Sequence, residues 1–450
     1  MKSDSEETYR RSSAFIGGCL SRCLCLSGIQ CVGVLADSSV DLTIPGVPLI
    51  SPALADPPEL KDADIQKALE FPIGSKSLFE IVRPGESLCI VVSDHTRHTA
   101  IDRVLPALIN GLLERGCAVE DMFIMIASGI HRHPSTTEIE RILGTATADR
   151  FRERIFLHDP DNSAELALVG TTSRGRRVLV NRQALASDRL ILTGTVIYHY
   201  HAGFGGGRKA LVPGLASRDT IAFSHSLTID PVDDRIHPGV GPGLLDGNPV
   251  SEEMLEGARL CEPDAIINTI LTPGGRIARV CAGELDAAHR AACGVARDIY
   301  SYSVPAPADL VIADAGSASN WIQSHKALFN AARAVHSDGR IVLVAPCPEG
   351  LGNERFRHWI RKKTVSEIFD GLRTAPEVLG QTALSTKERG RKTILVTGMP
   401  EHDIEDLGIR TAPDLESAIT AAVDDLRSAG IKEPTCYIMP QARYTVPFTD

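Results

Sequence analysis

Residues 88–98 read LCIVVSDHTRH, and this stretch gives the clearest signal for the fold. Its first six residues have the length and the apolar composition of a buried strand in a parallel sheet. Helical spacing of apolar residues follows over 101–115 and occurs again over 326–336. Further strand-like runs begin at Met122, Arg189, Asp309, Arg340 and Lys392. The alternation of such strands with helices predicts α/β architecture with largely parallel sheets.

The length of the chain predicts two domains. Its 450 residues exceed the usual size of a single hydrophobic core. A proline-bearing segment, 302–307, separates a helical stretch from the strand run at Asp309 and marks the boundary. We therefore expect an N-terminal, cofactor-binding α/β domain over 41–300 and a C-terminal α/β domain over 301–450 that closes over the substrate, around a central cleft. Residues 1–40 are left as an unassigned extension that contains Cys19, Cys23, Cys25 and Cys31.

Composition indicates a small-molecule partner. The formal net charge is -10 and the basic residues are scattered, which argues against a nucleic acid or a membrane surface as the main partner. No stretch approaches the roughly 20 apolar residues that a membrane span requires. Seven of the eleven cysteines lie singly along the chain beyond the extension, a usage typical of reduced thiols. A cytoplasmic protein is expected.

Polar side chains follow four of the strand runs. Ligands of open parallel sheets bind outside the carboxyl ends of the strands, so these side chains are expected to form a site. Arg97 could grip a carboxylate through two parallel hydrogen bonds, and Asp94 could orient a neighbour, although an Asp N-cap with a solvated arginine would explain both. The polar residues concerned are Asp94, Thr96 and Arg97, then His131, then His199, and finally Gln323 and Lys326.

A glycine-rich passage, 198–226, reads YHYHAGFGGGRKALVPGLASRDTIAFSHS. Its glycines between 203 and 207 permit close backbone approach, and Arg208 and Lys209 add cationic nitrogens, so a phosphate is the expected guest. His199, His201 and His225 flank this turn and suit proton transfer or metal binding. The passage fits neither the phosphate loop of nucleotide hydrolases nor the dinucleotide fingerprint. The residues alone therefore leave a metal or phosphate site with acid/base histidines.

Four motifs in one order carry a resemblance to a known family. They are DHTR at 94–97, GIHR at 129–132, HYHAGFGGGRK at 199–209 and QSHK at 323–326. With a histidine sixteen residues after Lys209, they resemble the lactate racemase family from about residue 41 to the C-terminus. The resemblance implies two α/β domains and a racemase or epimerase of 2-hydroxyacids that works by proton-coupled hydride transfer. It also implies dependence on a nickel-pincer nucleotide, the pyridinium-3,5-bisthiocarboxylic acid mononucleotide with nickel, and on cofactor biosynthesis proteins as partners.

The resemblance assigns a role to each motif residue. Lys209 would hold the cofactor covalently and His225 would be the nickel ligand. His131 and His199 would be the paired acid/base residues, one on each side of the substrate. The remaining positions would be Asp94, Thr96, Gly206 and Gly207 for the cofactor, and Arg97, Gln323 and Lys326 for the substrate.

Some positions depart from the family pattern. His98 stands in place of a proline, His201 in place of an aromatic residue and Gly205 in place of a serine, and no tryptophan lies between 380 and 387. The substrate is therefore left open between lactate and a larger or more polar 2-hydroxyacid, as is any part of His98 or His201 in the site. Two other functions remain open: a zinc-dependent hydrolase that uses His199 or His201 with His225, and a non-catalytic relative that binds the nucleotide or nickel.

Overall fold

The computed structural model describes residues 32–35, 38–41, 49–50 and 55–449, in two compact units. The N-terminal unit is Ala55–Tyr300, and the C-terminal unit contains the residues from Ser301 onward together with those described before residue 55. The four cysteines of the expected N-terminal extension lie outside the described residues.

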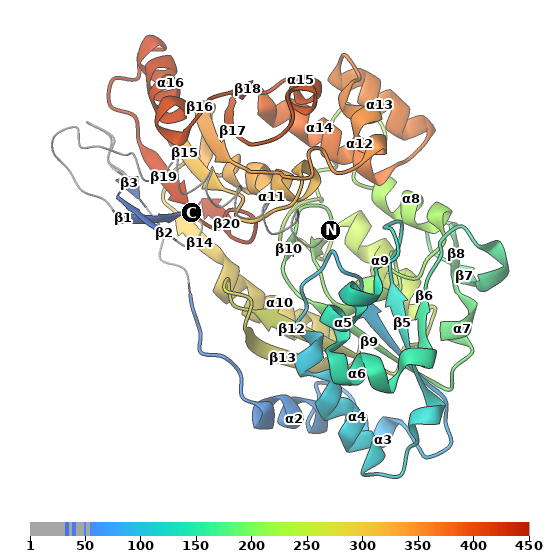
Figure 1. Cartoon of the computed structure of the whole chain (residues 1–450). Helices are drawn as coiled ribbons and strands as arrows, with labels where there is room; N and C mark the ends of the chain where they lie inside the picture. The colour runs from blue at the N-terminus through green and yellow to red at the C-terminus, as the bar shows by residue number, and fades with distance from the viewer. Residues whose placement is uncertain (1–31, 36–37, 42–48, 51–54, 450) are drawn as a thin grey trace. The chain divides into compact units, whose positions relative to one another are not determined.

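The N-terminal unit is built on a six-stranded sheet with the order β13-β12-β9-β4-β5-β6. Figure 1 labels these strands except β4. All neighbours in the sheet are parallel except β12 and β13. The central strands are buried because their side chains are apolar on both faces. The strands are β4 (Leu88–Ser93), β5 (Met122–Ala127), β6 (Ile155–Leu157), β9 (Arg189–Thr195), β12 (Ala265–Leu271) and β13 (Ile277–Gly283).

Helices and two small hairpins surround this sheet. The helices are α2 (Asp62–Glu70), α3 (Leu78–Ile81), α4 (Leu105–Leu113), α5 (Thr136–Leu143), α6 (Thr145–Arg150), α7 (Arg182–Leu185), α8 (Arg218–Ser226), α9 (Pro249–Arg259) and α10 (Ala287–Tyr300). The hairpins pair β7 (Leu166–Thr171) with β8 (Arg177–Asn181), and β10 (Tyr198–His199) with β11 (Gly203–Phe204). One apolar core joins α2 and α4 to β4 and β5, and α10 packs on β12 and β13.

The C-terminal unit has a second six-stranded sheet, in which every pairing is parallel, with the order β18-β17-β16-β15-β19-β3. Its strands are β3 (Leu49–Ile50), β15 (Ala308–Asp314), β16 (Val335–Val344), β17 (Thr393–Val396), β18 (Arg410–Thr411) and β19 (Cys436–Met439), and β14 (Ser301–Val304) pairs separately with β20 (Val446–Thr449). Its helices are α11 (Trp321–Ala331), α12 (Glu354–Ile360), α13 (Val365–Thr374), α14 (Val378–Gly390), α15 (Glu401–Leu407) and α16 (Leu415–Ser428). The described chain before residue 55 thus contributes β3 to the sheet of the C-terminal unit, beside β19.

The predicted fold class, α/β with largely parallel sheets, is confirmed. Each of the six predicted strand runs contains a strand. The helix expected over 326–336 spans Trp321–Ala331 instead, because the Asn320 side chain caps its first turn and β16 begins at Val335.

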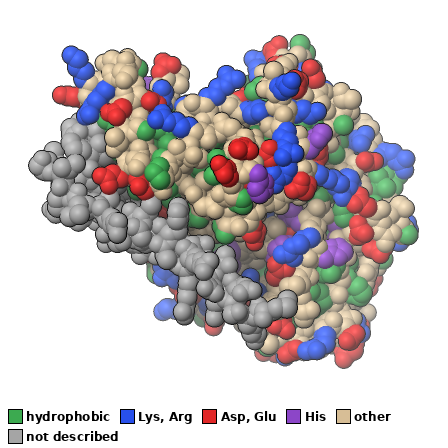
Figure 2. All heavy atoms as spheres, turned by 45° about the horizontal axis from the view of Figure 1, so that its top comes forward, with side chains coloured by type: hydrophobic (Ala, Val, Ile, Leu, Met, Phe, Trp, Pro, Cys, Tyr) green, Lys and Arg blue, Asp and Glu red, His purple; other side chains and the backbone are tan. Residues whose placement is uncertain are grey.

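The surface agrees with the scattered charge of the sequence. On the face drawn in Figure 2, Lys and Arg side chains are interspersed with Asp and Glu side chains. Among the described helices, none combines the length and the hydropathy needed to cross a membrane.

Candidate functional site

Asp94, Thr96 and His131 form a hydrogen-bonded cluster at the ends of β4 and β5. The two strands are parallel neighbours, with Ser93 opposite Ala127, so the residues that follow them emerge side by side. His131 Nδ1 lies 2.6 Å from Asp94 Oδ2, and Thr96 Oγ1 donates to Asp94 Oδ1 at 2.7 Å. The Asp94 carboxylate is buried, whereas the His131 side chain is 43% exposed.

The charge of Asp94 survives its burial. Burial on its own raises the pKa of this carboxyl. The hydrogen bond from His131, the charge that His131 carries when protonated, the Thr96 hydroxyl and the Arg97 guanidinium together hold the pKa below its usual value. An ionised carboxylate can only accept hydrogen bonds, so Nδ1 of His131 must carry the proton. The neutral ring then has its lone pair on Nε2, which is the arrangement of a general base with an orienting carboxylate.

The glycine turn begins just after β9 and lies on the sheet. Gly194 of β9 sits directly under it, since a Cβ at Gly194 would be 2.9 Å from the backbone of Gly206 and Gly207. Gly206 has φ +123°, and the N–H of Gly207 donates to Asn268 Oδ1 of β12 at 2.8 Å. The structure therefore explains both glycines by close packing within the protein.

Arg208 and Lys209 leave this turn with different surroundings. Arg208 is 2% exposed and donates to Ser251 Oγ at 2.9 Å, while its Nε is buried and has no hydrogen-bond partner among the described residues. Lys209 is partly buried. Burial, reinforced by the positive charges of Arg97 and Arg208, lowers the pKa of the Lys209 amine well below its ordinary value. This amine is thus biased toward its neutral, nucleophilic form.

His225 lies buried in α8. It is close enough to Lys209 for a protonated Lys209 amine to repel a protonated His225 ring. Burial and the positive charge of Lys209 lower the pKa of His225 to about 4, so the ring is neutral near pH 7. Its Nδ1 donates to the Ile221 carbonyl at 2.8 Å, which puts the lone pair on Nε2. This is the state in which a histidine binds a metal ion, with the second nitrogen held by a carbonyl.

His199 has the opposite tautomer preference from His131. The backbone N–H groups of His201 and Ala202 both donate to His199 Nδ1, each at 3.2 Å. Nδ1 therefore acts as an acceptor, and the neutral ring carries its proton on Nε2. His201 is buried beside Tyr200, with ring centroids 4.1 Å apart. His98 is exposed, and its Nε2 lies 3.1 Å from the Gly275 carbonyl.

The two predicted substrate residues of the C-terminal unit lie one turn apart on α11. Lys326 Nζ donates to Gln323 Oε1 at 2.7 Å, so the amide holds the ammonium in place. Their neighbour His325 is fully buried against Ser385 of α14, with Nε2 2.7 Å from its hydroxyl. Trp321 Nε1 donates to Thr386 Oγ1 at 3.1 Å, which fastens the same two helices.

Donor clusters typical of zinc hydrolases are not found in the part of the chain that the structure describes. No three His, Cys, Asp or Glu side chains there come together in a way that could hold a metal ion. His199, His201 and His225 thus do not form a three-ligand site in this conformation. His225 could still bind a metal ion as the single protein ligand.

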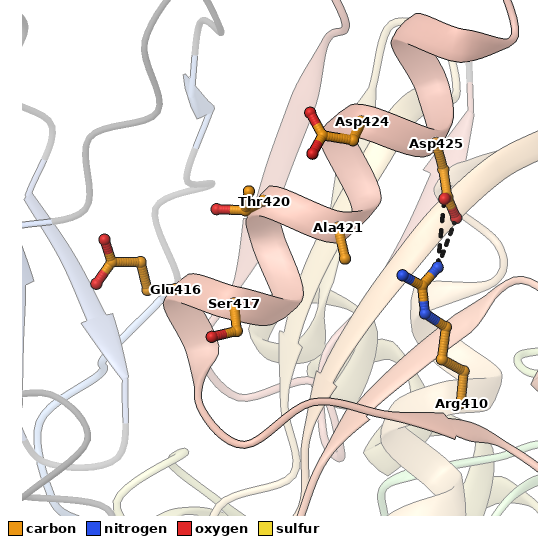
Figure 3. A pocket seen from close by; sticks show the side chains of 7 residues that line it. All are labelled: Arg410, Glu416, Ser417, Thr420, Ala421, Asp424 and Asp425. Carbon is orange, nitrogen blue, oxygen red and sulfur yellow. Dashed lines mark hydrogen bonds and ion pairs between the residues drawn. The ribbon is translucent and has the colours of Figure 1, made fainter.

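A separate hollow lies on the C-terminal unit, between Arg410 of β18 and α16. Its lining includes Glu416, Ser417 and Asp424 (Figure 3). The Arg410 guanidinium is engaged by Asp425, which it reaches at 3.0 and 3.2 Å. The hollow thus presents carboxylates and an already paired arginine, and it suits an anionic substrate poorly.

Comparisons with known proteins identify the family. Two family models match the chain, the lactate racemase N-terminal domain over residues 36–235 and the lactate racemase C-terminal domain over residues 304–431. The lactate racemase of Lactiplantibacillus plantarum is 31% identical over 300 residues, which make up 65% of this chain and 68% of that protein. The chain belongs to the lactate racemase family.

Other members of the lactate racemase family extend the similarity. The lactate racemase of Thermoanaerobacterium thermosaccharolyticum is 28% identical over 369 residues, 80% of this chain and 84% of that protein. The solved structure of the lactate racemase apoprotein from that organism superposes with a TM-score of 0.82 at 25% identity, covering 93% of this chain and 100% of that one. A Thermotoga maritima protein shares the fold, with a TM-score of 0.64 at 18% identity over 89% of this chain and 100% of that one. The predictions of the family and of an isomerase are confirmed.

Sequence reasoning missed two side chains that hold the glycine turn. Asn268 of β12 accepts the Gly207 N–H, and His289 of α10 lies 2.6 Å from the Gly205 carbonyl. Neither belongs to a recognisable motif.

Proposed function

We propose that this chain is a cytoplasmic, nickel-pincer nucleotide-dependent racemase or epimerase of a 2-hydroxyacid, lactate or a larger one. The grouping of Lys209 with Arg97 and His225 carries the proposal. Lys209 interacts electrostatically with each of the other two side chains, and burial leaves both the amine and the imidazole biased toward their neutral forms. The unpaired state of the seven cysteines in the described part of the chain supports a reducing compartment.

The residues present fit the proposed cofactor. A covalent bond to Lys209 requires a neutral amine, and the lowered pKa of Lys209 supplies one. A nickel ion with a single protein ligand requires an imidazole nitrogen with its lone pair available for coordination. The hydrogen bond from His225 Nδ1 to Ile221 directs the lone pair to Nε2. Enzymes that synthesise the cofactor would then be partners of this protein.

When bound, the cofactor would supply a hydride acceptor next to the substrate. The side chains of the chain itself have to manage the hydroxyl proton. His131 would take this proton on Nε2, because Asp94 holds the proton of the neutral ring on Nδ1. The buried carboxylate would also stabilise the imidazolium that forms.

The two histidines are not equivalent in the structure. His199 presents a protonated Nε2, since its Nδ1 accepts two backbone hydrogen bonds. To act as a base on Nε2, the ring must give up those two bonds. We infer that His131 is the base for one enantiomer and His199 the base for the other, and that the His199 ring must reorient for its part.

The substrate carboxylate would be held by cationic side chains. Arg97 follows Asp94 in the N-terminal unit, and Lys326 is held by Gln323 in the C-terminal unit. Arginine binds a carboxylate through two parallel hydrogen bonds, and a lysine adds a point charge. Asp94 would orient the His131 ring through their hydrogen bond, and the Thr96 hydroxyl would hold the Asp94 carboxylate in place.

The test follows the hydrogen on the substrate α-carbon. The loaded enzyme is given one enantiomer of a 2-hydroxyacid in deuterated water, and the product is analysed by mass spectrometry. We expect racemisation with the original hydrogen retained, because it moves as a hydride and not as an exchangeable proton. Deuterium incorporation at the α-carbon would contradict the proposal.

A matched pair of variants controls for the catalytic histidine. His131→Gln removes the base, while His133→Gln changes an exposed histidine on the same turn whose Nε2 contacts the His158 carbonyl. We expect racemisation to be lost in the first variant and kept in the second. Equal activity of the two would remove His131 from the mechanism.

A further inference from the structure

His289 is a buried, neutral side chain directly against the glycine turn. It lies on α10 with no exposed surface, and its Nε2 is 2.6 Å from the Gly205 carbonyl. A carbonyl oxygen only accepts, so Nε2 carries the proton and donates it. Burying such a ring is unfavourable unless its polar atoms are hydrogen-bonded, and here the partner is the backbone of the turn.

The tautomer of His289 is supported from its other side by Cys293. The Cys293 sulfur lies 3.7 Å from Nδ1 and 3.8 Å from Nε2, alongside the ring. Since Nε2 already donates, Nδ1 is the nitrogen that can accept from the thiol. Burial raises the pKa of Cys293 to about 12, so the thiol keeps its proton, and burial lowers the pKa of His289 to about 3, so the ring stays neutral.

The turn and the ring are packed closely together. A Cβ at Gly206 would be 2.6 Å from His289 Cδ2, closer than real atoms approach. The next residues are fixed as well. Gly207 N–H donates to Asn268, and Lys209 N–H donates to the Gly206 carbonyl at 3.0 Å. Only the five residues 205–209 therefore connect the carbonyl that His289 contacts with the backbone of Lys209. Gly205, Gly207 and Lys209 each donate a hydrogen bond from the N–H group.

We propose that His289 is a positioning residue that fixes the glycine turn and, through it, the backbone that presents the Lys209 amine. The role of Lys209 rests on the proposed function, whereas the hydrogen bond from His289 to Gly205 does not. The ring touches neither substrate nor cofactor in this account. Its contribution is to hold one conformation of residues 205–209.

Two nearly isosteric variants separate the hydrogen bond from simple packing. The amide nitrogen of glutamine reaches the position of a histidine Nε2, whereas that of asparagine reaches only the position of Nδ1. His289→Gln should therefore keep the donor to Gly205, and His289→Asn should lose it. Tyr300→Phe is the control, because it removes another buried hydrogen bond from the same helix, to the Leu271 carbonyl.

The first readout is amide hydrogen exchange in the protein without cofactor. Loss of one buried hydrogen bond should speed exchange in the peptide covering 203–211 by about five-fold in His289→Asn. His289→Gln and Tyr300→Phe should exchange like the wild type in that peptide. Equal exchange in His289→Asn and His289→Gln, or an equal increase throughout the N-terminal unit, would overturn the proposal.

The second readout is the yield of modified Lys209 after production with the cofactor pathway. We expect an about five-fold lower yield in His289→Asn and a yield restored by His289→Gln. Equal yields in the two would overturn the role of His289 toward Lys209. A wild type without any adduct would instead refute the proposed function, and hydrogen exchange alone would then decide whether His289 fixes the turn.

Discussion

Replacing Gly206 by alanine should destabilise the N-terminal unit by two separable effects. Gly206 has φ +123° and ψ 174°, a region that is open to glycine and costs other residues about 1–3 kcal/mol. The new Cβ would also lie 2.6 Å from His289 Cδ2 and 3.0 Å from Val196 Cγ2. Overpacking of this kind typically costs about 1–3 kcal/mol, so the sum is about 4 kcal/mol.

The control for this substitution is Gly85→Ala. Gly85 has φ +85°, and a Cβ there would meet nothing within 4 Å, so only backbone strain of about 1 kcal/mol is expected. Urea unfolding should be followed by circular dichroism, because both tryptophans, Trp321 and Trp359, lie in the C-terminal unit. If Gly206→Ala costs no more than Gly85→Ala, the packing of His289 against the turn is wrong.

Three further results are expected. Asp94→Asn should lower kcat by about 10²- to 10⁴-fold with the fold retained by circular dichroism, since the carboxylate that orients His131 is lost; unchanged kcat would refute this role. Lys326→Gln should raise KM for the hydroxyacid about ten-fold or more while kcat changes less, and an unchanged KM would remove Lys326 from substrate binding. Burial, with Arg389 and Lys326, lowers the pKa of His325 from 6.5 to about 3, so between these values the unfolded chain binds a proton that the native chain excludes. The free energy of unfolding should therefore fall as the pH drops below about 6.5. Urea unfolding at about pH 7 and about pH 5 should show a smaller loss of this free energy in His325→Gln than in the wild type. An equal loss in both would contradict the linkage.

The sequence predicted the strands better than the helix ends. Runs such as 88–92 and 122–127 are apolar throughout because both faces of a parallel strand are buried. β12 was missed, since Asn268 and Thr269 interrupt its apolar run. Both are buried and hydrogen-bonded, Asn268 to the glycine turn and Thr269 to the Thr99 carbonyl. Such tertiary partners leave no trace in local periodicity.

The candidate site was predicted in its residues but not in its contacts. Motifs predicted Asp94 and His131 in one site, but not the hydrogen bond between them, which depends on the pairing of β4 with β5. The glycines suggested room for a phosphate, whereas the structure packs Gly206 against His289 and Gly207 against Asn268. The capping box that Ser135 and Glu138 form at the start of α5 is a contact of another kind. Its partners are only three residues apart, so a local sequence pattern can indicate it.

The most direct test of the account is the mass of Lys209. The protein is produced together with enzymes that make the nickel-pincer nucleotide, and its intact mass is followed by peptide mapping. We predict an adduct of nucleotide mass on Lys209, absent in Lys209→Gln and still present in Lys326→Gln. An unmodified Lys209 in folded protein that has been supplied with cofactor and nickel would contradict the central claim.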